Sequence, residues 1–236
     1  MTDIALVTGA AGALGAEVAR TLFSRGCKLV LVDAERGKAR LEGLAATLGG
    51  ASIIAGDITQ TETWTEALPR VARELGGSPT LAALIAGAWR GGKPLHEEQD
   101  DDVWRAMMTA NLDTVHRSLR AILPGMVAQR RGSIVVVGAR AAEQPWTSAN
   151  AAAYAASKAA VVALARAVAV EVIDHGVRIN AILPSTMDTP ANRAAMPNAD
   201  ASKWVAPQSA AEVVAFLLSD GARDVSGAAL PVYGRA

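Results

Sequence analysis

Short apolar runs alternate along the chain with longer, Ala-rich stretches that have apolar residues at helical spacing. The short runs are rich in Val, Ile and Leu without polar alternation, which indicates strands covered on both faces. A strand followed by a helix, repeated, favours a parallel sheet with right-handed crossovers. We predict strands at 4–7, 29–32, 52–55, 81–85, 133–137, 177–183 and 229–232, and helices at 14–24, 36–48, 62–75, 101–127, 150–174 and 210–219.

These elements predict an α/β fold, namely a Rossmann-type doubly wound parallel sheet with helices on both faces. A length of 236 residues is enough for one such domain with a large core. Since the pattern contains neither a fixed-period repeat nor a linker, we expect a single domain over residues 1–236. A stretch rich in Pro, Ala and polar residues, at about 184–207, is expected to form a loop beside the substrate.

Composition excludes several classes of partner. Hydrophobic residues make up 51% of the chain and charged residues 19%, which is typical of a folded protein. Lys+Arg and Asp+Glu balance at 23 each, so no positive field favours nucleic acid or an anionic membrane. The apolar stretch 151–172 contains Lys158, Arg166 and Glu171, which argues against a transmembrane helix. A start without a basic leader, and the single Cys27, favour a cytoplasmic location.

A glycine-rich turn, Thr8–Gly15, joins the first predicted strand to the first helix. Small residues let the backbone approach a diphosphate, and the helix N-terminus directs N–H groups and partial positive charge at it. The plainer interpretation is a tight turn that needs glycine, but the position between strand and helix favours a dinucleotide site. The expected contacts come from Gly9, Ala11, Gly12, Leu14 and Gly15.

Acidic residues follow the next two strands. A carboxylate at Asp33 can accept hydrogen bonds from both adenine-ribose hydroxyls and would repel a 2′-phosphate, which predicts NAD(H) in preference to NADP(H). The alternatives are a solvated loop aspartate, or a phosphate site at the nearby Arg36. Asp57, next to Ile58, is a candidate acceptor for the adenine amino group, although an aspartate here more often begins a helix.

Tyr154 and Lys158 lie four residues apart on a predicted helix and therefore share one face. A free tyrosine has a pKa of about 10, and a nearby ammonium and a positively charged nicotinamide both favour the phenolate. With both cations close, we expect a lowered pKa for Tyr154 and a role in acid–base chemistry. The alternative is a surface tyrosine beside a solvated lysine, because this spacing also occurs by chance.

Taken together, these residues resemble the short-chain dehydrogenase/reductase family over essentially the whole chain. The resemblance implies that Tyr154 exchanges a proton with the substrate oxygen, that Lys158 holds the nicotinamide ribose, and that Asn111 binds a relay water. It also implies cofactor contacts from Ala86, Gly87, Pro184, Met187 and Thr189. Further matching motifs are Asn180–Pro184, Ser219-Asp220 and Ser226-Gly227.

Three positions depart from the family pattern. Ala139 replaces the usual active-site serine, with Thr147 or Ser148 as candidate substitutes; Leu84-Ile85 replaces paired asparagines, and Ser185 replaces a glycine. The loops at 86–92 and 183–200 show a narrower resemblance to dihydropteridine reductases, which share the alanine and reduce a quinonoid ring. Asn111 is not the residue expected at this position in that subfamily, so reduction of an ordinary carbonyl stays an alternative.

The expected function is hydride transfer between NAD(H) and a carbonyl, alcohol or quinonoid substrate. The alternatives are a specific dihydropteridine reductase-like activity, and a non-catalytic NAD-binding sensor suggested by Ala139. Trp89, Trp146 and Trp204 fall in loops after strands, where they suit a planar or aromatic small molecule. Trp64 and Trp104, on helices, are interpreted as packing residues. The histidines have no metal-ligand spacing, so no metal is expected.

The helix predicted at 150–174 presents Ala and Val on its outer side. Small side chains allow close helix packing, and the resemblance implies pairing of this kind between subunits. We therefore expect a homodimer or homotetramer.

Overall fold

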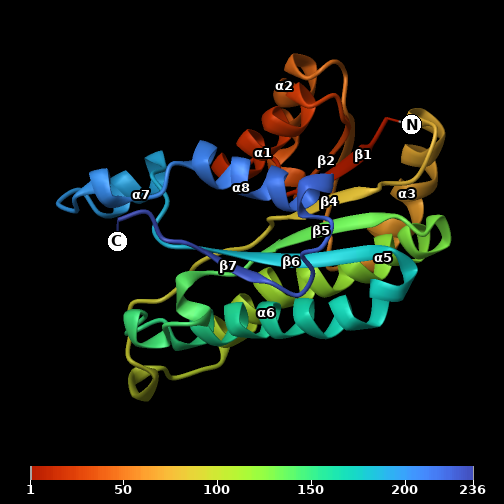
Figure 1. Ribbon diagram of the computed structural model, residues 1–236. Coiled ribbons are helices and arrows are strands. Elements are labelled where there is room, and N and C mark those ends of the chain that lie inside the picture. The colour runs from red at the N-terminus through yellow and green to blue at the C-terminus, as the bar shows by residue number, and fades with distance from the viewer. Residues whose placement is uncertain (1, 236) are drawn as a thin grey trace.

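A computed structural model describes residues 2–235 and contains one seven-stranded, wholly parallel sheet (Figure 1). The strand order is β3-β2-β1-β4-β5-β6-β7, which reverses direction between β1 and β4. The predicted fold class is confirmed. The strands are β1 (Ile4–Thr8), β2 (Lys28–Asp33), β3 (Ser52–Ala55), β4 (Leu81–Leu84), β5 (Gly132–Val137), β6 (Val177–Pro184) and β7 (Ala229–Val232).

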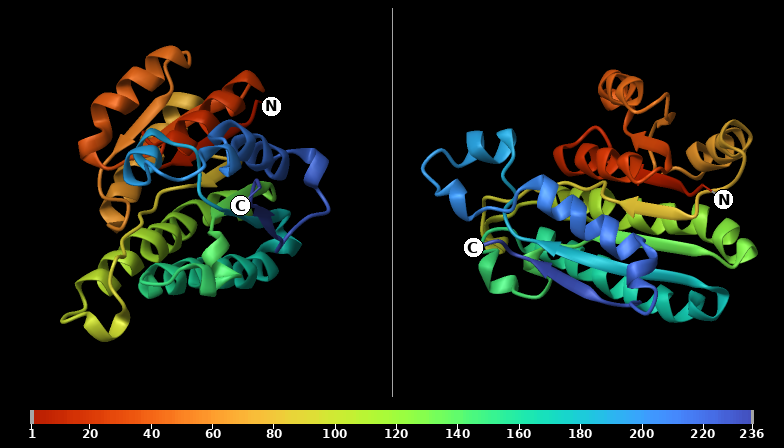
Figure 2. Two further views of the ribbon diagram at one scale, coloured as in Figure 1. Left: turned by 90° about the vertical axis from the view of Figure 1, so that its left-hand side faces the viewer. Right: turned by 45° about the horizontal axis from the view of Figure 1, so that its top comes forward.

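Helices cover both faces of the sheet (Figure 2). One face packs on α1 (Ala13–Ser24), α2 (Lys38–Thr47) and α8 (Pro207–Leu218), and the other on α3 (Thr61–Leu75), α5 (Thr114–Gln129) and α6 (Ala152–Val172). Neighbouring strand residues join opposite cores: Val30 packs in one and Leu31 in the other, and both are fully buried. This two-sided burial explains why the strands are apolar without alternation.

The long helix predicted over 101–127 is present, but it is not α-helical throughout. The structure has α4 (Asp102–Met107), a π-helical segment (Met108–Asp113) and then α5. A π-turn accommodates one more residue than an α-turn and is frequent at functional sites. Asn111 lies inside this segment and is fully buried, so the irregularity coincides with a candidate site residue.

The segment predicted as a loop at 184–207 contains a short helix, α7 (Pro190–Ala195). The Thr189 hydroxyl accepts a hydrogen bond from the Asn192 N–H at 3.2 Å, and Pro190 occupies the first helical position. Both features favour a helix start. The next helix, α8, begins at Pro207, three residues before the predicted start.

The two tryptophans interpreted as packing residues, Trp64 and Trp104, differ in how far they are buried. The Trp64 side chain is 2% exposed, and its indole N–H donates to the Ile58 carbonyl at 2.9 Å. Trp104 is 48% exposed, so its expected role in packing is wrong for this chain. Trp104 does lie on a helix, α4, but a helical position does not by itself show which face the fold covers.

The loops that follow β4, β5 and β6 gather at the carboxyl edge of the sheet, on the left of Figure 1. Open α/β sheets bind ligands at this edge, where the strand order reverses. Within residues 2–235, no helix is both long enough and apolar enough to span a membrane.

Candidate active site

The glycine-rich turn packs closely, backbone against backbone, at the start of α1. Gly9 has φ +66°, and a Cβ there would lie 2.9 Å from the Ala86 backbone nitrogen. A Cβ on Gly15 would overlap the Gly9 carbonyl oxygen. The first turn of α1 has no side-chain cap and no acidic residue, so its free N–H groups suit a diphosphate. Leu14, by contrast, is buried in the core, and Ala11 and Gly12 lie at the surface of the turn.

Asp33 is fixed beside this turn by two backbone hydrogen bonds. Its Oδ2 accepts from the Ala11 N–H at 2.9 Å, and its Oδ1 accepts from the Ala34 N–H at 2.8 Å. A Cβ on Gly37 would lie 3.0 Å from Oδ1, so the small residue gives the carboxylate its space. Arg36 is exposed. The carboxylate is therefore held rather than solvated, and each oxygen keeps a lone pair for a further donor.

Asp57 forms a turn before α3. Its Oδ1 accepts from the Thr59 hydroxyl at 2.7 Å and the Thr59 N–H at 2.9 Å, and these bonds lower the pKa of Asp57. Ile58 beside it is buried. The interpretation of Asp57 as a residue that begins a helix is wrong, because α3 starts at Thr61 with Gln60 as its N-cap. The Asp57 Oδ2 has only a 3.5 Å contact with Gln60.

The Lys158 ammonium is buried, and its Nζ donates to the Val137 carbonyl at 2.9 Å, at the end of β5. Burial lowers the pKa of Lys158 to about 8. Burial also raises the pKa of Tyr154 to about 12. In the chain alone, loss of hydration outweighs any attraction by Lys158. The lowering of the Tyr154 pKa by Lys158 together with a positively charged nicotinamide stays a prediction.

Asn111 connects three segments through its side-chain amide. Its Oδ1 accepts from the Ala88 N–H at 2.9 Å, and its Nδ2 donates to Ser157 Oγ at 2.9 Å. Ser157 Oγ donates in turn to the Tyr154 carbonyl at 2.8 Å. Sequence reasoning missed Ser157, although its position three residues after Tyr154 on the same helix was a usable signal.

Gly87 lies between Asn111 and Lys158. A Cβ on Gly87 would lie 2.7 Å from Asn111 Oδ1 and 3.2 Å from Lys158 Nζ. Nearby, the Thr8 hydroxyl accepts from the N–H groups of Ile85 at 2.9 Å and Ala86 at 3.1 Å, which ties β1 to the loop after β4. The structure thus brings Asn111, Lys158 and Gly87 into one place beside the glycine-rich turn.

Ala139 is buried and belongs to a small apolar cluster with Ala141 and Ala155, against which Tyr154 packs. The position where the serine was expected therefore does adjoin Tyr154. Thr147 is exposed, and its hydroxyl donates to the Gln144 carbonyl at 2.7 Å within its own loop. The structure gives Thr147 no contact with Tyr154.

The segment expected to hold the nicotinamide carboxamide follows β6 and is held in place by contacts with neighbouring segments. Met187 and Val205 form a bridge, and the Asn192 side-chain amide donates to the Met187 carbonyl at 2.8 Å. The Thr189 hydroxyl is engaged as the N-cap of α7. Pro184 is the last residue of β6.

The three candidate substrate tryptophans lie in different loops. Trp89 is 65% exposed and Trp146 is 76% exposed, whereas Trp204 is half-buried. The Gly92 N–H donates to the Asn150 carbonyl at 2.8 Å and so joins the loops that carry Trp89 and Trp146. The structure brings those loops together but does not bury their indoles.

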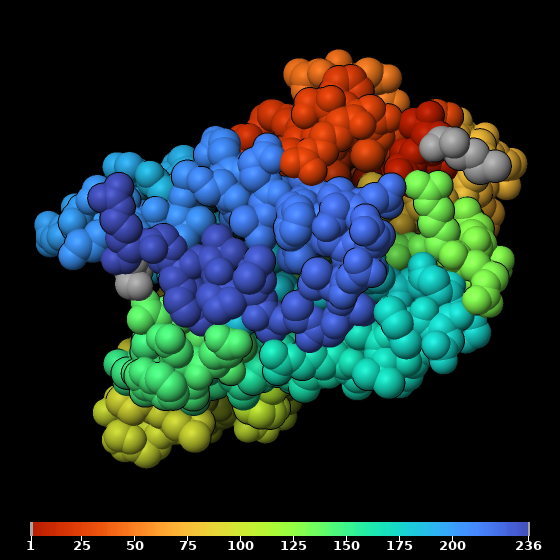
Figure 3. All heavy atoms as spheres, viewed as in Figure 1, coloured from red at the N-terminus to blue at the C-terminus, as the bar shows by residue number. Residues whose placement is uncertain are grey.

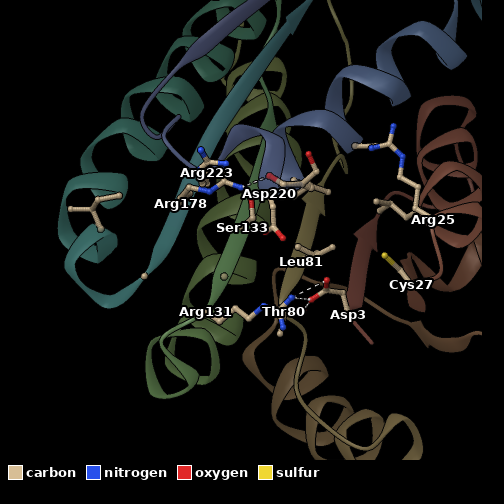
Figure 4. Close-up of a pocket in the computed structure, with 17 residues that line it drawn as sticks. Asp3, Arg25, Cys27, Thr80, Leu81, Arg131, Ser133, Arg178, Asp220 and Arg223 are labelled. Atoms are coloured by element: carbon tan, nitrogen blue, oxygen red, sulfur yellow. Dashed lines mark hydrogen bonds and ion pairs between the residues drawn. The ribbon is translucent and has the colours of Figure 1, made fainter. Parts of the chain in front are cut away.

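A cavity of about 500 Å³ lies at the opposite edge of the sheet, near the amino ends of the strands (Figure 4). Arg131 pairs with Asp3 at 2.8 Å. Arg178 donates to the carbonyls of Leu217, Ser219 and Val225. Arg178 thus holds β6 to α8 and its following turn, whereas Arg131 ties the start of β5 to the residue before β1. None of the predicted site residues lines the cavity. Across residues 2–235, no three His, Cys, Asp or Glu side chains are grouped to hold a metal ion.

A glycine turn at the switch point of a parallel sheet, with a tyrosine and a buried lysine at the same edge, defines a Rossmann-type oxidoreductase. The family model described as short chain dehydrogenase matches residues 3–200. The chain therefore belongs to the short-chain dehydrogenase/reductase family.

Relatives with named activities cover nearly the whole chain. The chain is 32% identical to 2,5-dichloro-2,5-cyclohexadiene-1,4-diol dehydrogenase of Sphingobium indicum, over 98% of this chain and 94% of the relative. It is 34% identical to cis-4-hydroxycyclohexanecarboxylate dehydrogenase of Sinomonas cyclohexanicum, over 98% and 95%. A solved NAD+-bound xylitol dehydrogenase is 26% identical and superposes with a TM-score of 0.86, over 98% of each chain. These similarities support an oxidoreductase.

The buried Lys158 predicts opposite effects on stability and activity. A pKa lowered from 10.5 to about 8 corresponds to roughly 3 kcal/mol of unfavourable burial at neutral pH. Lys158→Met also removes the bond to Val137, which costs about 1 kcal/mol. We expect the free energy of unfolding at pH 7 to rise by about 1–3 kcal/mol in urea titrations, while turnover is lost.

The pH dependence provides the control. The unfolded chain binds more protons than the folded chain between the folded pKa of Lys158, about 8, and the unfolded value of 10.5, so parent stability rises over this window. Lys158→Met should lack that rise, and the exposed-site variant Lys38→Met should retain it. A destabilised Lys158→Met protein would contradict the burial argument.

Proposed function

We propose that the chain is an NAD(H)-dependent oxidoreductase that interconverts a carbonyl and an alcohol, or reduces a quinonoid ring, with Tyr154 as its acid–base group. The observation that carries the proposal is made at the carboxyl edge of the sheet. There Asn111 is linked through Ser157 to the Tyr154 backbone carbonyl. Lys158, bonded to the Val137 carbonyl, lies beside Gly87 together with Asn111. Substrate and cofactor would meet there, within a single domain spanning 1–236, under the segment 184–207.

NADH, when bound, supplies a hydride to the substrate carbon. Tyr154 donates its phenolic proton to the substrate oxygen, and its raised pKa keeps that proton available through the neutral range. The Lys158 ammonium would favour the phenolate that remains and would hold the nicotinamide ribose. Asn111 would hold a water in the relay that returns a proton to Tyr154. Pro184, Met187 and Thr189 would hold the carboxamide, Ala86, Gly87 and Ile58 would line the path of the cofactor, and Asp57 would accept a hydrogen bond from the adenine amino group.

Ala139 narrows the range of substrates that the proposed enzyme would accept. A serine here would donate a hydrogen bond to the substrate oxygen, and alanine cannot, so the proposal favours substrates that need little polarisation. A quinonoid ring meets that condition, which keeps the dihydropteridine reductase-like activity as a second candidate. Trp89, Trp146 and Trp204 would border a planar or cyclic substrate. The names of the two relatives, both dehydrogenases of six-membered-ring alcohols, support a cyclic substrate.

Tyr154→Phe tests the central assignment. The hydroxyl is the proposed proton donor, so we expect kcat to fall by 10²-fold or more with NADH affinity unchanged. NADH oxidation is measured against cyclic ketones, diketones, quinones and quinonoid dihydropterin. Tyr233→Phe removes the chain's other phenol and is the matched control. Near-full activity of Tyr154→Phe would contradict the assignment of Tyr154 as the proton donor. NADH binding without turnover of any of these compounds would favour a non-catalytic sensor.

Cofactor preference rests on Asp33. Its fixed carboxylate would accept from the ribose hydroxyls and repel a 2′-phosphate. We expect NADH to bind at least 10-fold more tightly than NADPH in fluorescence titrations, and Asp33→Asn to narrow this ratio chiefly by improving NADPH binding. Equal or tighter NADPH binding by the parent chain would contradict the proposal.

A homodimer or homotetramer is proposed from exposed apolar side chains on two helices. Val170 on α6 is 77% exposed and Phe216 on α8 is 48% exposed. Exposed apolar groups on helix faces of small residues favour association. Light scattering at micromolar concentration should give a mass of two or four chains, and Val170→Glu should weaken an assembly through α6. A monomeric mass would refute it.

A further inference from the structure

Arg140 occupies a defined position beside the candidate site. It follows Ala139, which packs against Tyr154. Its Nε donates to Gln144 Oε1 at 2.8 Å, and its guanidinium lies 5.3 Å from the centre of the Tyr233 ring. Stacking on an aromatic face and a bond at Nε fix the plane of a guanidinium.

Tyr233 is itself held by two other segments. Its hydroxyl donates to Glu143 Oε2 at 3.1 Å, and its carbonyl accepts from the Ser185 hydroxyl at 2.8 Å. The neighbouring Arg235 N–H donates to the Lys203 carbonyl at 3.1 Å. Figure 3 shows the end of the chain, in dark blue, lying against the segment after β6. The support for Arg140 thus comes from the loops after β5 and β6 together with the C-terminal segment.

The charge on Arg140 lacks a counter-ion. Other arginines pair with carboxylates, such as Arg193 with Asp188 and Arg70 with Glu74. Within residues 2–235, no carboxylate lies within 4.0 Å of the Arg140 guanidinium, and its two terminal nitrogens have no hydrogen-bond acceptor. A half-buried, positioned guanidinium with free donors is an arrangement suited to a bidentate oxyanion.

We propose that Arg140 binds a carboxylate of the substrate, so that the enzyme acts on a carboxylate-bearing cyclic alcohol or ketone. This inference rests on the proposed function. Ala139 borders Tyr154, and the next residue supplies the anion anchor, so one short stretch would fix both the reacting carbon and the distal charge. By orienting the substrate, Arg140 would compensate for the hydrogen bond to the substrate oxygen that Ala139 cannot make.

Direct binding tests the anchor without relying on turnover. Benzoate and its neutral isostere benzamide are titrated calorimetrically into the protein with and without saturating NADH. We expect benzoate to bind at least 10-fold more tightly than benzamide, and Arg140→Met to remove this difference while leaving benzamide binding within 2-fold. Arg20→Met, which removes an exposed arginine on α1, is the matched control. Equal affinity for the two probes, or a preference that survives Arg140→Met, would overturn the anchor.

Kinetics with 4-oxocyclohexanecarboxylate and its methyl ester separate anchoring from folding effects. Arg140→Met should raise KM for the acid by 10-fold or more with little change for the ester, and Arg140→Lys should restore part of the affinity. Equal KM increases for both compounds would mean a structural role and would reject the proposal. If neither compound is turned over but benzoate binding depends on Arg140, the anchor stands and the proposed reaction fails.

Discussion

The burial of the Lys158 ammonium is the constraint on which the candidate site depends. Removing an ammonium from water is unfavourable unless polar groups replace the lost hydration. The Val137 carbonyl at the end of β5 supplies one acceptor, and the absence of a side chain at Gly87 leaves the space that Nζ occupies. A strand end, a helix and a loop must therefore meet within a few ångströms, and the parallel sheet provides that meeting point at its carboxyl edge.

The π-helical segment follows from the same requirement. Asn111 must reach the Ala88 N–H on one side and Ser157 on α6 on the other, and it does so from a fully buried position. The extra residue of a π-turn shifts the face that a helix presents at that point, without ending the helix. The irregularity thus lets one amide hold the loop after β4 against the helix that carries Tyr154 and Lys158.

The sequence predicted the fold well because it depends on apolar runs and their order. The Tyr154–Lys158 pair was also accessible, because four-residue spacing on a helix is a local property. The π-helical segment, the bond from Asn111 to Ser157 and the exposure of Trp104 were not, because they depend on contacts between segments distant in the chain. The raised pKa of Tyr154 in the chain alone was not accessible either, because spacing shows which charges are near but not how much water the fold removes.

The loss of water around Tyr154 bears on how the pair would work. With a pKa raised to about 12, Tyr154 is protonated in the chain alone, so in the proposed mechanism it would start as an acid for reduction rather than a base for oxidation. Lys158, with a pKa near 8, keeps most of its charge at neutral pH and loses it in mildly alkaline solution. The phenolate needed for oxidation therefore requires positive charge beyond what the chain's own residues supply. On this argument, the direction of proton transfer at Tyr154 depends on the charge of the bound cofactor, and the protein provides a dry site in which that charge acts strongly.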